Sequence, residues 1–198
     1  MPDLWDPLTY KTLMAGTVAH FETQELKPLA SNITIEGPGI YALYYKGKIP
    51  AYRPIADGRH PIYVGKAVPS GARKGGGGDV TAPALRNRLR DHTKSIREAQ
   101  NLDPEDFLFR ALAIVPVWIV FAEQALIKQY QPVWNTCLEG FGKHDQGRNR
   151  AATTQSWWDT LHPGRRWATR GADQRARERT PGQARKLVKA YFLEQLGR

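Results

Sequence analysis

The chain has 198 residues, 41% of them apolar and 10% aromatic, so it is long and apolar enough to fold around a core of its own. Its single cysteine, Cys137, excludes an intrachain disulfide and a cysteine-based zinc site. The longest apolar run, residues 111–122, is shorter than the roughly 20 residues of a membrane-spanning helix. The first residues are acidic where a signal peptide is basic. We therefore expect a cytoplasmic protein without a membrane partner.

The net charge of +10 is concentrated at the C-terminal end of the chain. Residues 141–198 hold 13 of the 29 Lys and Arg residues but only 5 of the 19 Asp and Glu residues, which leaves residues 1–140 nearly neutral. A basic segment of this kind is typical of proteins that bind a nucleic-acid backbone. Charge alone is equally compatible with a solvated basic face.

The N-terminal half of the chain predicts a helix followed by a β-hairpin. Apolar residues in segment 1–32 recur at loose helical spacing, and Pro28 ends the pattern. Residues 40–45 and 62–65 are rich in β-branched and aromatic side chains, and an antiparallel pair is the simplest arrangement for them. The glycine run 75–78 lacks the spacing of a phosphate-binding loop, so we interpret it as an ordinary loop.

The second half alternates helices with one more strand. Residues 84–102 predict a helix with a stripe of apolar residues at the 3.6-residue period, namely Leu85, Leu89 and Ile96. Residues 107–115 predict a buried strand, and residues 117–130 a very apolar helix. A last helix begins after Thr180, which has Gln183 at the capping-box position. The expected fold is a small α/β (α+β) domain in which helices flank a mostly antiparallel sheet.

Glu123 stands out because its neighbours at helical spacing are apolar. Ile119 and Ile127 lie one turn before and after it on the predicted helix. A carboxylate in such surroundings is destabilising unless a cation pairs with it. The pattern therefore indicates either a structural salt bridge or a metal ligand.

Arg88 and His92 lie one turn apart on the edge of the apolar stripe of the preceding helix. At that position both side chains can point into the crevice between helix and sheet, although most pairs with this spacing lie on a surface.

The hairpin contains two triplets that identify a family. Tyr41 closes Gly39-Ile40-Tyr41, and Tyr63 opens Tyr63-Val64-Gly65, followed by Lys66. This pattern resembles the GIY-YIG nucleases, in which the two triplets precede a helix with a catalytic Arg and a later helix with a metal-binding Glu. Arg88, His92, Glu123 and Asn135 occur here in the same order. Stretches 61–69, 135–150 and 158–165 are similar to the type II restriction endonuclease branch of the family, which cuts CCGCGG.

The resemblance implies the domain organisation and the roles of these residues. It divides the chain into a helical N-terminal extension (1–32), a GIY-YIG nuclease domain (33–140) and a basic DNA-contacting extension (141–198). Glu123 would ligate one Mg²⁺ and Arg88 would bind the scissile phosphate. Tyr41 would accept the proton of the attacking water, either with its pKa lowered by Arg88, Lys66 and the metal, or with His92 as its proton partner. Tyr63 and Asn135 would complete the site.

The expected partner is double-stranded DNA. A palindromic target implies a homodimer with one catalytic site for each strand, and a restriction enzyme implies a cognate DNA methyltransferase. The expected DNA contacts are Lys66, Lys143, His144, Arg148, Arg150, Arg165 and Arg166.

Two alternatives remain at this stage. A GIY-YIG repair or homing nuclease would share the chemistry, but such enzymes carry large further domains or a long linker, for which 198 residues leave no room. A catalytically inactive DNA-binding module is expected to have lost Arg88 or Glu123, and both are present.

Overall fold

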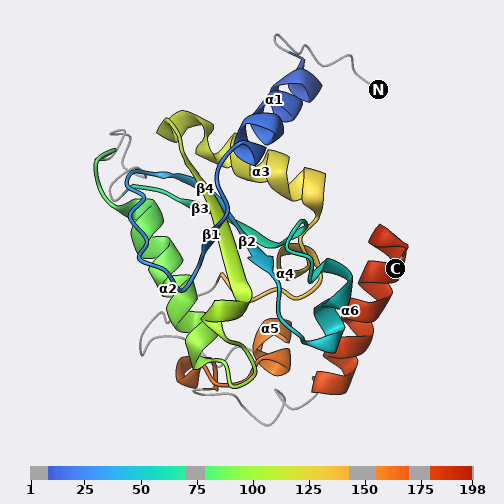
Figure 1. The fold of residues 1–198 in the computed structure, drawn as a ribbon. Coiled ribbons are helices and arrows are strands. Elements are labelled where there is room, and N and C mark those ends of the chain that lie inside the picture. The colour runs from blue at the N-terminus through green and yellow to red at the C-terminus, as the bar shows by residue number, and fades with distance from the viewer. Residues whose placement is uncertain (1–8, 70–78, 143–154, 170–178, 198) are drawn as a thin grey trace.

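The computed structural model describes residues 9–69, 79–142, 155–169 and 179–197. Its centre is an antiparallel sheet with the strand order β1-β4-β2-β3 (Figure 1). The strands are β1 (Lys27–Pro28), β2 (Gly39–Tyr45), β3 (Pro61–Ala67) and β4 (Phe107–Ala113). Helices α1 (Tyr10–Glu22) and α3 (Ile119–Tyr130) pack together on one face of the sheet. The other face is covered by α2 (Ala84–Glu98), α4 (Val133–Thr136), α5 (Trp157–Leu161) and α6 (Pro181–Leu196). The predicted α/β class is confirmed.

Strand β2 is buried along its whole length because it pairs with β3 on one side and β4 on the other. The predicted hairpin is therefore present, and Tyr41 lies opposite Gly65 in it. Gly39, which begins the strand, lies so close to β4 that a Cβ at this position would be 2.0 Å from the carbonyl oxygen of Leu112. A larger residue would push the two strands apart.

Alternate residues of β2 face different halves of the core, as the period of two in a strand requires. Ile40, Ala42 and Tyr44 pack on α1 and α3. Tyr41, Leu43 and Tyr45 face the opposite way, toward the helices on the other side of the sheet. The tyrosines of the two triplets therefore lie on the α2 side.

Helix α2 buries the predicted stripe of Leu85, Leu89 and Ile96 completely. Each such side chain stabilises the fold by roughly 1.5–3 kcal/mol. The helix ends at Glu98, four residues earlier than predicted, because the C-terminal segment packs on its end. A Cβ on Gly164 would lie 1.9 Å from the carbonyl oxygen of Glu98, and the backbone N–H of Gln100 donates to the Pro163 carbonyl at 2.7 Å.

Several short elements were not predicted. Lys27 and Pro28 pair with β4 as the edge strand β1, so the N-terminal segment contributes to the sheet as well as a helix. The polar loop after β2 contains the 3-10 helix η1 (Pro50–Ile55), in which Tyr52 is fully buried. Short 3-10 helices also precede β4 (η3, Pro104–Asp106) and α3 (η4, Pro116–Trp118).

The C-terminal segment is folded onto the body where the structure describes it. The predicted capping box of α6 is confirmed, since Thr180 Oγ1 accepts from the Gln183 backbone and Gln183 Oε1 accepts from the Thr180 backbone. Ala184, Val188 and Phe192 form the buried face of α6, which contacts η1 and α5.

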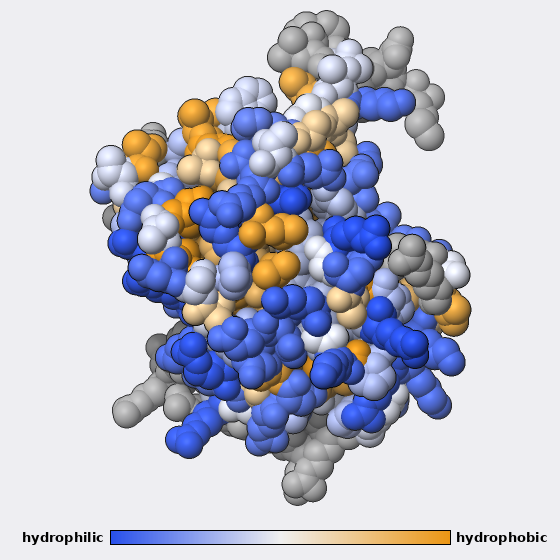
Figure 2. Space-filling model, viewed as in Figure 1, coloured by the Kyte–Doolittle hydropathy of each residue, from blue (hydrophilic) through white to orange (hydrophobic). Residues whose placement is uncertain are grey.

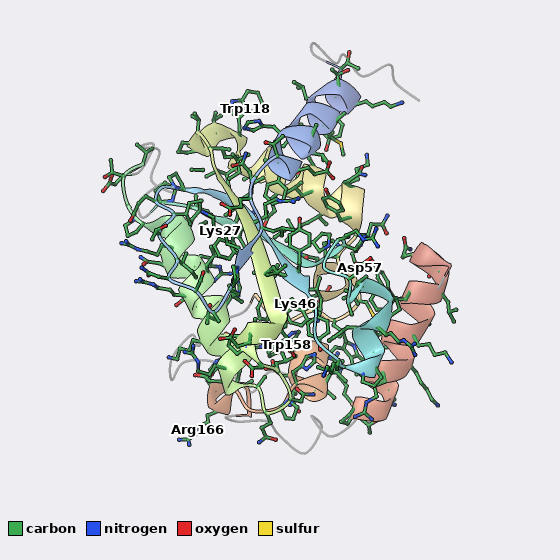
Figure 3. All side chains as sticks on the ribbon, in the orientation of Figure 1. Lys27, Lys46, Asp57, Trp118, Trp158 and Arg166 are labelled. Atoms are coloured by element: carbon green, nitrogen blue, oxygen red, sulfur yellow. The ribbon has the colours of Figure 1, made fainter. Side chains whose placement is uncertain are left out.

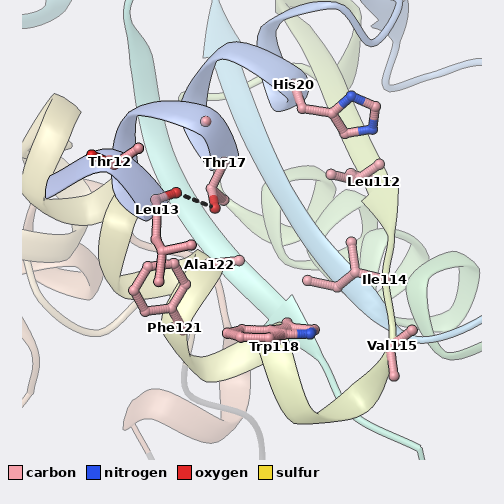
Figure 4. A pocket seen from close by; sticks show the side chains of 11 residues that line it. Thr12, Leu13, Thr17, His20, Leu112, Ile114, Val115, Trp118, Phe121 and Ala122 are labelled. Carbon is pink, nitrogen blue, oxygen red and sulfur yellow. Dashed lines mark hydrogen bonds between the residues drawn. The ribbon is translucent and has the colours of Figure 1, made fainter. Parts of the chain in front are cut away.

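Exposed apolar side chains gather around α1, η4 and α3, as Figure 2 shows. They include Val115, Val117 and Trp118, which are 65%, 77% and 49% exposed. Beside them is an apolar cavity of about 520 Å³ between α1, the end of β4 and the start of α3, lined in part by Leu13, Trp118 and Phe121 (Figure 4). None of the predicted site residues lines it. Among the described helices, none is both long and apolar enough to cross a bilayer.

Candidate active site

Tyr41 and His92 form the buried centre of the candidate site. The hydroxyl oxygen of Tyr41 lies 2.5 Å from Nε2 of His92, and neither side chain has exposed surface. Arg88, one turn before His92 on α2, donates from Nε to the same hydroxyl oxygen at 3.3 Å. Because a guanidinium can only donate, the Tyr41 hydroxyl accepts from Arg88, and the same hydroxyl shares a hydrogen bond with Nε2 of His92.

Gly65 is required because Tyr41 lies across it. A Cβ at this position would be 2.4 Å from the Tyr41 hydroxyl oxygen and 3.0 Å from the Tyr63 ring. The Tyr41 and Tyr63 rings are 6.2 Å apart between centroids. The glycine of the second triplet therefore leaves room for the tyrosine of the first, which explains why the two triplets occur together.

Burial raises the pKa of the Tyr41 hydroxyl well above its usual value, and Tyr63 raises it further, while Arg88 acts in the opposite direction. Burial also raises the pKa of Tyr63 against the opposing effect of Arg88. Burial thus outweighs Arg88, and the Lys66 ammonium is paired with Glu123 rather than with Tyr41, so that a lowered Tyr41 pKa would depend on the predicted metal. The structure instead brings His92 to Tyr41 as its proton partner.

Glu123 on α3 is paired with Lys66 at the end of β3. The Glu123 side chain is 17% exposed and that of Lys66 is 35% exposed, so the pair lies just below the surface. Both residues belong to the α3 side of the sheet, whereas Tyr41 and Tyr63 face α2. Glu123 is nevertheless near enough to raise the pKa of Tyr63. The two groups of side chains thus meet around β3, which lies at the edge of the sheet.

Asn135 connects α4 to the same strand. Its Oδ1 accepts from the backbone N–H of Val64 and its Nδ2 donates to the Val64 carbonyl, both at 2.8 Å. The amide is therefore engaged with the backbone beside Tyr63 and supports the position of that tyrosine.

Glu123 is the predicted metal ligand, and its surroundings are compatible with Mg²⁺. In the described part of the chain, no three His, Cys, Asp or Glu side chains cluster as a metal site. Mg²⁺ is often held by one or two carboxylates while keeping several waters. Glu123 is a single, partly exposed carboxylate and so fits that requirement. The ion would have to replace the Lys66 ammonium with which Glu123 is paired in this structure.

Sequence reasoning missed the segment that packs against the site from the C-terminal side. The ring of Phe141 stacks on His92, with centroids 4.5 Å apart and an interplanar angle of 20°. The carbonyl of Gly142 accepts from Nη2 of Arg88 at 3.0 Å, and a Cβ on Gly142 would be 2.5 Å from the Tyr63 hydroxyl. The glycines flanking Phe141 are the signal in the sequence that could have indicated close packing here.

The prediction that Arg165 contacts DNA is wrong for this structure. Arg165 is 1% exposed and its guanidinium is bound to Asp159 and to the carbonyls of Gly140 and Phe141. A buried, fully engaged guanidinium cannot reach a DNA groove.

Arg166, the next residue, is exposed and extends from the lower edge of the fold, while Trp158 lies inside it (Figure 3). Its contact with DNA stays a prediction. The other four predicted DNA contacts in the tail, Lys143, His144, Arg148 and Arg150, lie outside the described residues.

Tyr41, Arg88 and His92 meet beside β3, in a fold that the family match assigns to nucleases of the GIY-YIG class. The comparison with protein families narrows this class. The family model described as the Eco29kI GIY-YIG domain matches residues 34–190. The chain therefore belongs to the Eco29kI GIY-YIG family of restriction endonucleases. No curated protein matches it.

Proposed function

We propose that the chain is a type II restriction endonuclease that makes Mg²⁺-dependent double-strand cuts in DNA at CCGCGG. The observation that carries the proposal is the extent of the family match, residues 34–190, which includes most of the basic C-terminal segment as well as the nuclease core. A match limited to the core would support only the general chemistry of the superfamily.

Arg88 binds the scissile phosphate in this proposal. Its guanidinium is held by Tyr41 and Gly142 yet remains partly exposed at the edge of the site. A guanidinium has more N–H donors than these two contacts use, and its planar fork matches phosphate oxygens. It stays charged at any working pH, so it can balance the charge that develops on the phosphate.

Tyr41 and His92 move the proton. As the attacking water loses a proton to the Tyr41 oxygen, the Tyr41 proton passes to Nε2 of His92, which becomes an imidazolium. The resulting hydroxide forms a bond to phosphorus, the bond to the 3′ oxygen breaks, and that oxygen leaves as an alkoxide, which takes a proton from solvent water. Because Tyr41 has no exposed surface, the DNA-bound state has to admit one water to its hydroxyl.

Glu123 would hold the Mg²⁺, with Lys66 released to the phosphate backbone. When bound, the ion supplies positive charge to the phosphate oxygens and lowers the pKa of its waters. The partial exposure of both side chains allows this exchange without unpacking the core.

The palindromic target implies a homodimer, in which each subunit cuts one strand, and protection of host DNA by a methyltransferase. Arg166 and the basic stretch beginning at Lys143 are the proposed DNA contacts. Light scattering of the purified protein, alone and with a CCGCGG duplex, tests the dimer.

The central experiment replaces Glu123 by Ala and by Gln and measures cleavage of a plasmid that carries one CCGCGG site, with and without Mg²⁺. We expect cleavage to fall by at least about 1,000-fold in both variants, because the metal ligand is lost, while DNA binding persists. Gln124→Ala, an exposed neighbour on the same helix, is the matched control and should cut normally. Wild-type cleavage by Glu123→Gln would contradict the metal assignment.

Mapping the ends of the cleavage products tests whether the chain acts as a restriction endonuclease. Ends at CCGCGG alone support the restriction function. Scattered ends would favour a repair or homing type of nuclease, and DNA binding without any cleavage would favour an inactive binding module.

A further inference from the structure

The turn Gly140–Gly142, here called the site turn, contacts three of the candidate catalytic residues. Phe141 stacks on His92 and meets Tyr63 edge-on, with centroids 4.5 and 4.9 Å away. The Gly142 carbonyl receives the Nη2 hydrogen bond of Arg88 at 3.0 Å. The position of this turn therefore sets the orientation of His92 and Arg88.

Arg165 binds the backbone of the site turn. Its Nη2 donates to the Gly140 carbonyl at 3.0 Å and its Nη1 to the Phe141 carbonyl at 3.1 Å. Its Nε donates to Asp159 Oδ1 at 2.7 Å. Each edge of the planar fork is thus used by a different acceptor, so that the guanidinium, the carboxylate and two successive carbonyls are fixed together.

The surroundings of Arg165 leave it little freedom. The guanidinium lies over the rings of Trp158 and Trp167, 4.3 and 4.6 Å from their centroids, and Asp159 also accepts from Ser156 Oγ at 2.6 Å. Gly140 has φ +122°, and a Cβ there would be 2.1 Å from Ser156 Oγ, so the turn lies directly against this group.

Stability alone is a weak explanation for such an arginine. A buried ion pair often contributes little net stability compared with apolar residues of the same volume. Its geometry, in contrast, is specific, because only a guanidinium can bind one carboxylate and two adjacent carbonyls in a plane. The arrangement fixes a turn that also makes the contacts to His92 and Arg88.

We propose that Arg165 is a positioning residue of the nuclease: it holds the site turn so that Phe141 orients His92 and the Gly142 carbonyl orients Arg88. The proposal rests on the proposed nuclease function and deepens it. The predicted DNA-contacting stretch begins at Lys143, immediately after the turn in the sequence, so Arg165 also fixes the point at which that stretch leaves the catalytic residues.

The first test is Arg165→Lys, which keeps the charge but loses the planar fork. At a temperature well below its melting point, we expect kcat per folded enzyme to fall about 100-fold, as small misplacements of catalytic groups do, with KM changed by less than about threefold. Arg179→Lys is the matched control, because Arg179 also lies over a tryptophan and donates to a carbonyl, that of Gln155, without touching the site turn. Its kcat should be unchanged.

A second variant separates positioning from simple loss of stability. Phe141→Leu leaves Arg165 and Asp159 intact but removes the ring stacked on His92, and it should lower kcat by a similar factor. Because both changes act through one turn, the double variant should lose little more than the larger single loss. Wild-type kcat in Phe141→Leu, or in folded Arg165→Lys, would overturn the proposal, as would fully additive losses.

A readout independent of activity distinguishes failure of this proposal from failure of the proposed function. The ring protons of His92 experience the ring current of the stacked Phe141, so their NMR resonances should shift in Arg165→Lys and remain in place in Arg179→Lys. Unchanged resonances in Arg165→Lys would overturn the positioning role. If the wild-type protein does not cut DNA, the nuclease proposal fails while this measurement still reports on the turn.

Discussion

Two tyrosine–histidine pairs are buried on the same side of the sheet, and only one belongs to the candidate site. The hydroxyl of Tyr41 lies 2.5 Å from Nε2 of His92, and that of Tyr52 lies 2.5 Å from Nε2 of His162. The ring centroids are 5.4 and 5.6 Å apart, and all four side chains are fully buried. Distance and burial do not distinguish the two pairs.

The two pairs differ in the group that donates a hydrogen bond to each tyrosine hydroxyl. Tyr41 accepts from Arg88, a partly exposed cation. Tyr52 accepts from the neutral indole N–H of Trp134 at 2.9 Å, and the second ring nitrogen of His162 lies 2.9 Å from Asn101 Oδ1. The hydrogen-bond partners of the second pair are thus neutral groups. The Tyr41 pair therefore differs from the Tyr52 pair in that its hydroxyl is shared with a cation whose geometry suits phosphate.

Tyr41→Phe should give the largest effect. The ring keeps its packing, but the hydroxyl that joins Arg88 to His92 is lost, so the cleavage rate should fall by about 10²–10⁴-fold. Single-turnover cleavage of the CCGCGG plasmid with Mg²⁺ measures this, with Tyr52→Phe as the matched control. Equal losses in the two variants would show that the pairs do not differ in function.

Acid should act on the second pair through stability. Burial, assisted by Arg165, lowers the pKa of His162 to about 3, below the value of about 6.5 in an unfolded chain. The unfolded state therefore binds more protons between these values, so the stabilising contribution is complete above about pH 6.5 and decreases as the pH falls. Between pH 7 and 5 we expect a loss of about 2 kcal/mol relative to His162→Asn, from urea unfolding. Parallel curves for wild type and His162→Asn would contradict the assignment.

Tyr52→Phe should lower the free energy of unfolding by about 1–3 kcal/mol, because the Trp134 indole and His162 lose a buried partner. Cleavage at temperatures well below the melting point should be unchanged. A loss of kcat without a loss of stability would place Tyr52 in the catalytic machinery.

Asn101→Ala should have the smallest effect. Asn101 is exposed, so water can replace the oxygen that faces His162, and we expect a destabilisation of about 1 kcal/mol with normal cleavage. Thermal unfolding measures it. A destabilisation equal to that of Tyr52→Phe would show that His162 depends on Asn101 as much as on Tyr52.

The sequence predicted the elements whose signals are local. The β-branched and aromatic residues of segment 40–45, the stripe that includes Leu85 and Leu89, and the capping box at Thr180 each reflect a short-range rule, and each predicted element is confirmed. The gathering of Tyr41, Arg88 and His92 followed from the family resemblance, because their order along the chain does not by itself define a distance.

The contacts that the sequence did not predict depend on partners that are distant in the sequence. Tyr52 and His162 are 110 positions apart, so the residues next to each of them in the sequence do not indicate that the two side chains form a pair. Arg165 carries the same charge as its exposed neighbour Arg166, and only the acceptors supplied by Asp159 and the site turn decide that one is buried. The sequence indicated that Glu123 pairs either with a cationic side chain or with a metal ion. The structure shows a cationic side chain, that of Lys66, beside it.

The contact between Asn135 and Val64 has a consequence for solubility. Val64 belongs to β3, whose free edge would otherwise offer backbone groups to a strand from another molecule, a common route to aggregation. One amide side chain occupies both the donor and the acceptor of Val64 and so takes the place of an intruding strand. An aspartate there would set a second acceptor against the Val64 carbonyl and open the edge. Replacement of Asn135 should therefore promote self-association as well as alter the backbone beside Tyr63.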